Sequence, residues 1–239
     1  MPEPTLPDAC ELPATVNGWL YDADDTSNGL VFRSRDHECS LGVFDTLSAV
    51  SVRVTDDRVR GFASNVDLER IEYDRDETDA LRQGLAFARE WMETTGPAEW
   101  SHPDVCEAVF DAPPGYALET YNLENREAIV YYRRLNADVD QESIDLRAAD
   151  PSVYTRETCP YLYVHEWRGS GNATVALAPW TNAHGPGSKY PELREVAETP
   201  DGCGLEVAVT VAREWAREVD GGAIDTDAAG QAPLSRWSA

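Results

Sequence analysis

Lysine is almost absent from this sequence: all but one of its 20 basic residues are arginine, the exception being Lys189. Basic residues of both kinds are also scarce beside the 44 acidic ones, so the 239-residue chain has a formal charge of −24. Nucleic acid binding needs a basic patch against the phosphates, and no basic stripe with interleaved aromatic residues occurs. We therefore do not expect a nucleic acid partner.

The acidic residues are spread over the whole chain and do not form a single tail. Short carboxylates keep a surface hydrated in molar salt better than long lysine side chains do. At about 1 M salt the Debye length is about 3 Å, so the self-repulsion of such a charge is tolerated. This pattern predicts a halophilic protein; an ordinary acidic protein from a GC-rich genome is the alternative.

Long hydrophobic runs are also absent. None approaches the ~18 apolar residues that cross a bilayer, so we expect no membrane interaction. The first residues carry acids and prolines, without the basic segment and apolar stretch of a secretory signal. The predicted location is therefore the cytoplasm.

Cysteine is sparse, with five widely spaced residues and no Cys-x-x-Cys pair. In a cytoplasmic chain this pattern predicts reduced thiols that pack as small core residues. A chain of this length buries enough surface to fold without disulfide or metal staples. No pattern in the sequence requires a cofactor, and we expect none.

Hydrophobic residues nonetheless make up 42% of the chain, which suffices for a packed core. Alternating apolar residues such as Val50, Val52 and Val54 predict strands, and helical periodicity predicts amphipathic helices at about 77–95 and 204–219. Strands come in runs that are each followed by a helix. The expected fold class is therefore α+β, with two antiparallel β-sheets each backed by a C-terminal amphipathic helix.

The two predicted helices share the segment Ala-Arg-Glu-Trp, at 88–91 and 212–215, in similar strand-then-helix contexts. This repetition predicts an internal duplication of two related halves. The expected division is a first half at 16–97, a connector with a short helix starting at Ser101 within 98–114, and a second half at 115–222. The ends, 1–15 and 223–239, lack periodicity and are expected to be flexible.

The most distinctive segment runs from Asn182 to Tyr190 and combines glycine and proline with His184, Ser188 and Lys189. A compact ammonium can hold an anion, and backbone amides beside glycines can approach it closely. We expect a protein partner or a small anionic ligand here, so the preferred function is a non-catalytic binding or regulatory module. The alternative is a structured surface loop whose lysine has no special role.

A small enzyme is the rival interpretation of the same loop. His184 would act as acid or base and Lys189 as an electrostatic clamp on an anionic substrate. No nucleophile elbow or other catalytic signature accompanies them.

Zinc binding is a second alternative. His37 and Cys39, together with His102 and Cys106, supply a ligand set that suits zinc. Nothing in the sequence fixes the distance between the two pairs, so separate thiols and imidazoles explain the same residues.

One predicted strand places Tyr161, Tyr163, His165 and Trp167 on a single face. An exposed aromatic row of this kind can stack on bases or bind a partner. We expect instead a strand buried on both faces, with His165 as a satisfied polar residue at the edge.

Overall fold

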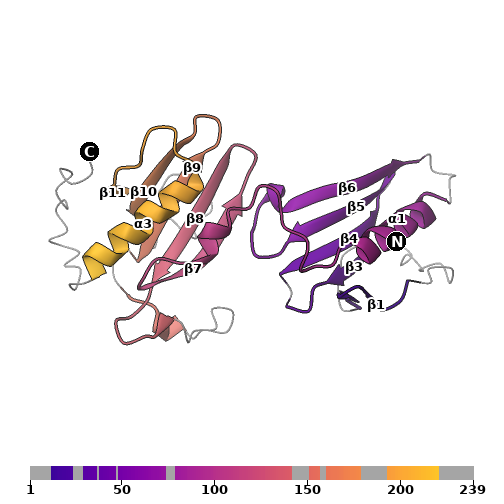
Figure 1. Ribbon diagram of the computed structural model, residues 1–239, viewed down its shortest axis with the longest axis horizontal. Helices are drawn as coiled ribbons and strands as arrows, with labels where there is room; N and C mark the ends of the chain where they lie inside the picture. The colour runs from indigo at the N-terminus through magenta and orange to yellow at the C-terminus, as the bar shows by residue number, and fades with distance from the viewer. Residues whose placement is uncertain are drawn as a thin grey trace. The chain divides into compact units, whose positions relative to one another are not determined.

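The computed structural model describes residues 12–23, 29–36, 38–46, 48–73, 79–141, 151–156, 160–178 and 193–220, without the side chains of Phe62 and Asp220. Contacts within the chain divide it into two compact units, Met1–Val105 and Cys106–Ala239, which are described separately. The division falls inside the connector predicted at 98–114. Among the described residues each unit has one sheet and one long helix, which can be followed in Figure 1.

The first unit is a six-stranded antiparallel meander in which each strand pairs with the next along the chain. Its strands are β1 (Thr15–Val16), β2 (Trp19–Tyr21), β3 (Gly29–Arg33), β4 (Cys39–Asp45), β5 (Ala49–Asp56) and β6 (Asn65–Glu72). A short 3₁₀ turn, η1 (Phe62–Ser64), precedes β6, and helix α1 (Ala80–Thr94) follows it.

The core of the first unit lies between one face of this sheet and α1. Leu41 pairs with Val54 across β4 and β5, and Val50, Val52 and Val54 of β5 are fully buried, as the period-two alternation predicts. Ala88 and Met92 of α1 are fully buried in the same cluster. The indole Nε1 of Trp19 donates a hydrogen bond of 2.8 Å to the carbonyl of Thr95, which ties β2 to the end of the helix.

The second unit is a five-stranded antiparallel meander in the order β11-β10-β9-β8-β7. Its strands are β7 (Tyr116–Leu123), β8 (Glu127–Arg134), β9 (Tyr161–Trp167), β10 (Asn172–Ala178) and β11 (Arg194–Ala197). The 3₁₀ turns η2 (Glu107–Phe110) and η4 (Pro151–Val153) lie before and within the sheet sequence, and helix α3 (Leu205–Asp220) ends the described part.

Helix α3 packs across β9 and β10, as Figure 1 shows. Its stripe includes Ala208 and Ala212, both fully buried. On β9, Leu162 and Val164 point to the face opposite Tyr161 and Tyr163, because successive strand residues alternate between faces. All four are fully buried, so the central strand of this sheet is covered on both sides.

The expected α+β class with antiparallel sheets is confirmed, and both predicted helices occur within three residues of their expected bounds. A short helical turn does form within the predicted connector, but it is the 3₁₀ turn η2 at Glu107–Phe110 and does not start at Ser101. The reason is that Nδ1 of His102 accepts the hydrogen bond from the Asp104 amide, which a serine at the start of a helix would otherwise accept. Within the described residues, no helix is long and apolar enough to cross a bilayer.

Candidate functional site

The predicted binding loop lies between β10 and β11. Asn182, His184, Ser188 and Lys189 fall outside the residues that the structure describes. The flanking strands are described, and the pairing of Leu177 with Arg194 makes them neighbours in the sheet. The loop therefore joins two adjacent antiparallel strands at one end of the second unit's sheet.

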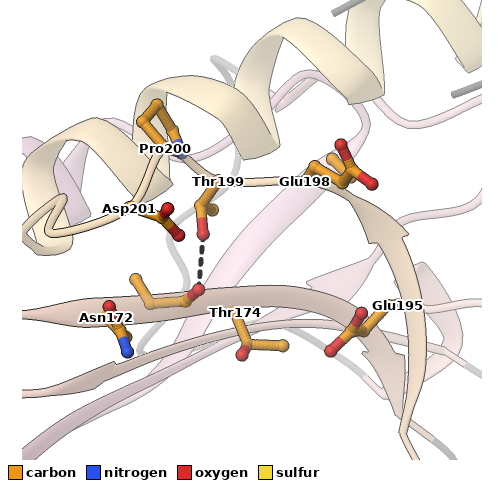
Figure 2. A pocket seen from close by; sticks show the side chains of 9 residues that line it. Asn172, Thr174, Glu195, Glu198, Thr199, Pro200 and Asp201 are labelled. Atoms are coloured by element: carbon orange, nitrogen blue, oxygen red, sulfur yellow. Dashed lines mark hydrogen bonds between the residues drawn. The ribbon is translucent and has the colours of Figure 1, made fainter. Parts of the chain in front are cut away.

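A pocket of about 360 Å³ lies at the opposite end of the same strand pair. The register of β10 and β11 shifts between Val175 and Ala176, and β11 ends at Ala197, opposite Val175. The chain then passes over the start of β10, where the Thr199 hydroxyl donates a hydrogen bond of 2.5 Å to the carbonyl of Ala173 (Figure 2). This bond holds the rim of the pocket against the strand.

The pocket is lined mainly by acidic and neutral polar side chains and by no basic one. Its lining residues are Asn172, Ala173, Thr174, Glu195, Ala197, Glu198, Thr199, Pro200 and Asp201. Figure 2 shows Asp201 and Asn172 at one end and Glu195 and Glu198 at the other. A pocket of this chemistry favours positively charged groups over anions.

The predicted aromatic row lies on β9, the strand that pairs with β10. Tyr161 and Tyr163 are fully buried and His165 is 3% exposed, which confirms the core interpretation for these three residues. Trp167 departs from it with 38% exposure. Trp167 pairs with Asn172 of β10, and directly paired residues share a face of the sheet, so the indole lies next to a residue of the pocket wall.

His165 is satisfied, as expected, by the carboxylate of Glu127 on β8, at 3.0 Å from Nε2, but it is buried on the central strand and does not lie at an edge. Burial lowers the pKa of His165, and it outweighs the opposing effect of the Glu127 carboxylate. The neutral imidazole then donates its Nε2–H to Glu127. The Trp167 ring lies 4.3 Å from the imidazole, measured between centroids, and helps to close the pair off from solvent.

Sequence reasoning missed Glu127 and all of the pocket carboxylates. Glu127 opens an apolar strand, and only the pairing of β8 with β9 brings it to His165. Glu195, Glu198 and Asp201 are three of 44 acidic residues, so composition gave no signal that distinguished them.

The zinc ligand set is only partly described, because His37 lies outside the described residues. His102 uses both ring nitrogens within the fold: Nε2 lies 2.7 Å from the Ala63 carbonyl, and Nδ1 accepts from the Asp104 amide at 3.0 Å. Across the described part of the chain, no group of three or more His, Cys, Asp or Glu side chains is placed to hold a metal ion.

The described cysteines are free thiols, as the sequence predicts. Cys39 and Cys203 are buried, and Cys106 is half-buried. Burial raises the pKa of Cys39 to about 11 and also raises that of Cys106. Because the thiolate is the nucleophilic form, these two thiols are poorly suited to covalent catalysis at neutral pH.

Comparison with protein-family models, with curated proteins and with solved structures finds no match to this chain.

Proposed function

We propose that this protein is a non-catalytic binding or regulatory module whose contact surface is the loop from Asn182 to Tyr190. The observation that carries the proposal is the state of the described thiols and imidazoles. The Cys39 thiol stays protonated, and His102 has both ring nitrogens engaged. His165 is buried against a carboxylate. None of these groups is available as a nucleophile or base, which favours binding over catalysis.

The position of the loop supports the same proposal. Functional residues concentrate on loops that a rigid scaffold holds in place. Here the scaffold is the pair β10 and β11, backed by α3. Lys189 and the neighbouring glycine amides suit a protein partner or a small anionic ligand.

The test compares the tagged full-length protein with the double variant His184→Ala/Lys189→Ala. Partners are captured from the protein's own cytosol in molar KCl, and phosphate binding is measured by calorimetry. A matched control, Arg60→Ala/Gln83→Ala, changes two exposed residues of the first unit. We expect the partner or anion to be retained by the wild type and the control and lost by the loop variant. Equal retention by all three contradicts the proposal.

The enzyme interpretation remains the rival, because Lys189 is the single lysine of the chain. Lys189→Arg separates the two. A contact that needs only positive charge keeps part of its affinity in this variant, whereas a step that needs the amine is lost.

Zinc binding is the second alternative, and it requires His102 to give up two hydrogen bonds. The test is metal analysis of protein purified without chelators. A zinc content well under one per chain excludes this alternative.

We also propose a halophilic, cytoplasmic setting. The charge of −24 and the single lysine support it. The expected result is that the free energy of unfolding rises steeply as KCl increases from about 0.1 to about 1 M, where the Debye length falls from about 10 to 3 Å. Stability that is independent of KCl favours the ordinary acidic protein instead.

Finally, we infer that the two units arose by internal duplication. In each unit the last strand of a meander leads into a helix, and the shared segment places Ala88 and Ala212 in fully buried positions. The test is an alignment of the two halves across related sequences, in which apolar positions beyond Ala-Arg-Glu-Trp are expected to coincide. Coincidence limited to those four residues contradicts the inference.

A further inference from the structure

The last strand of the first unit's sheet, β6, has one edge without a neighbouring strand. It pairs with β5 on one side, and no strand in the described part of the chain pairs with its other side (Figure 1). The opposite edge of the sheet is β1, which has only two residues, whereas β6 has eight. A long strand with a free edge is a template for pairing with a further strand.

A β-bulge lies at the centre of β6. Val52 of β5 is paired with Glu69, and the next residue of β5, Arg53, is paired with Asp67. Leu68 is therefore the extra residue of the bulge. It packs against the core cluster under α1, and Glu69 shares this face because its partner Val52 belongs to the same cluster. Two successive side chains thus lie on the face that α1 covers.

From this bulge the side chains alternate in the same way toward both ends of β6. Val66 and Ile71 pack against the core on the face that α1 covers, and Asp67 and Arg70 lie on the opposite face. The order of faces is therefore the same from either end of the strand. Two antiparallel copies of β6 can then pair about the bulge with every residue opposite one on its own face, as strand pairing requires. A strand without the bulge could not pair in this register.

The charges of β6 match in the same register, which sets Asp67 opposite the partner's Arg70. Asp67 makes no ion pair within the described part of the chain. Arg53, its neighbour on β5, lies instead over the Phe44 ring, at 4.7 Å from the centroid. The Arg70 side chain is 57% exposed and reaches Glu72 only at 3.7 Å. Both charged groups are therefore open to a second copy.

We propose that β6 pairs with β6 of a second copy of this chain, antiparallel and about a two-fold axis at the bulge, so that the two sheets become continuous. Val66 then pairs with the partner's Ile71 on one face, and Asp67 pairs with the partner's Arg70 on the other. Main-chain hydrogen bonds and the apolar pairs supply most of the affinity, and the ion pairs select the register. A shift by one residue in either direction would set Glu69 opposite an acidic residue.

This surface goes beyond the proposed function, because it lies in the first unit and the loop Asn182–Tyr190 belongs to the second. The test is the mass of the full-length protein, measured by sedimentation equilibrium over a range of concentrations. It uses about 1 M KCl, where the Debye length is about 3 Å and the charge of −24 on each chain is well screened. We expect the mass to rise with concentration to that of two chains. A mass of one chain at every concentration overturns the proposal.

Reversal of either charge tests the register. Asp67→Arg sets arginines opposite each other at two positions of the dimer, and Arg70→Asp does the same with aspartates, so each variant alone should associate about tenfold more weakly than the wild type. An equimolar mixture of the two variants should associate like the wild type, because every charge then meets its opposite. The double variant Asp67→Arg/Arg70→Asp should also regain wild-type association.

The matched controls are Glu218→Arg and Arg217→Asp, which make the same changes of charge at exposed positions of α3. Both controls should associate like the wild type. The proposal is overturned if the controls weaken association equally, if reversal at β6 has no effect, or if a double variant that is folded by circular dichroism does not regain association. The loop variant His184→Ala/Lys189→Ala should keep the mass of the wild type, so the edge and the loop can fail separately.

Discussion

The two units end in helices that carry the same Ala-Arg-Glu-Trp segment, yet the arginine makes different contacts in each. In α1, Arg89 pairs with Glu93 one turn later at 2.8 Å, and both side chains are about half exposed. In α3, Arg213 is 15% exposed and reaches back to η2. Its Nε donates to the Asp111 carbonyl at 2.7 Å, and its Nη2 donates to the Ala108 carbonyl.

This difference separates what a repeated segment determines from what its neighbours determine. The alanine is fully buried in both helices because helical periodicity puts it on the face that packs on the sheet. The arginine lies at the edge of that face, where its partner depends on what is packed beside the helix. In the second unit η2 packs against α3, so a carbonyl of η2 and that of Asp111, the residue after it, become the acceptors.

The buried acids of the two units differ in the same way. Asp56 of the first unit is 1% exposed and binds Arg58 at 2.7 Å, only two residues away. Glu127 of the second unit binds His165, 38 residues away on the next strand. The first contact is local, whereas the second holds two strands in register.

Among the variants that test this comparison, we expect the largest loss of stability for those of the Glu127–His165 pair. His165→Leu removes the donor from a buried carboxylate and should lower the free energy of unfolding of the second unit by about 3 kcal/mol. Glu127→Gln keeps an acceptor and should cost less. Hydrogen exchange of the β8 and β9 amides measures the local stability, and equal costs for the two variants would contradict the assignment.

Substitution of the arginine of the shared segment should have the next largest effect on stability, and the effect should differ between the two units. Arg213→Ala removes charged hydrogen bonds to two carbonyls and should cost about 2 kcal/mol. Arg89→Ala removes one exposed pair and should cost about 0.4 kcal/mol. Denaturant unfolding followed at each helix by hydrogen exchange compares them, and similar costs would show that the repeated segment acts alike in both units.

The pH dependence of the second unit should follow from His165. Its pKa is lowered in the folded state from the ordinary value of 6.5, which the unfolded chain keeps. As pH falls below about 6.5, His165 is therefore protonated to a greater extent in the unfolded chain than in the folded one. The contribution of His165 to the free energy of unfolding is therefore fully present above about pH 6.5. It decreases as the pH decreases, by at most about 1.4 kcal/mol per pH unit. In His165→Asn this part of the slope should vanish, and the first unit, measured in parallel, should not change with it.

A further effect concerns the position one turn before the shared alanine, which is Gly84 in α1 and Ala208 in α3. A Cβ on Gly84 would lie 2.5 Å from Cγ1 of Val50, so α1 approaches its sheet too closely for alanine. Gly84→Ala should lower stability by about 1 kcal/mol, despite the better helix propensity of alanine. Adding Val50→Ala should relieve the clash; if it does not, close packing is not the reason for the glycine.

Much of the architecture follows from local patterns in the sequence. The alternation of Val50, Val52 and Val54 specifies a strand with one face on the core, and the apolar stripes specify both helices. Strands β1 and β2 were not predicted, because two or three residues are too few to show the alternation of apolar and polar residues that marks a strand. The helical turn in the connector starts at Glu107 and not at Ser101, because the His102 ring accepts the Asp104 amide hydrogen bond, a contact that spacing rules do not contain.

The candidate site was harder to predict for a physical reason. The pocket depends on where β11 parts from β10, and a shift in strand register leaves no mark in composition. The Glu127–His165 pair likewise exists only once β8 and β9 are aligned. The loop Asn182–Tyr190 was recognised because glycine, proline and a single lysine are locally unusual, so it remains a prediction from sequence alone.

The Thr199–Ala173 hydrogen bond also bears on how this protein could change over evolution. It fastens the chain beyond β11 to the start of β10, at the end of the strand pair away from the connecting loop. The closure entropy of a flexible loop grows slowly, by about 0.6 kcal/mol for each doubling of its length. The loop between these strands can therefore be lengthened, shortened or replaced while the pocket keeps its shape, so one end of the hairpin can diversify while the other stays constant.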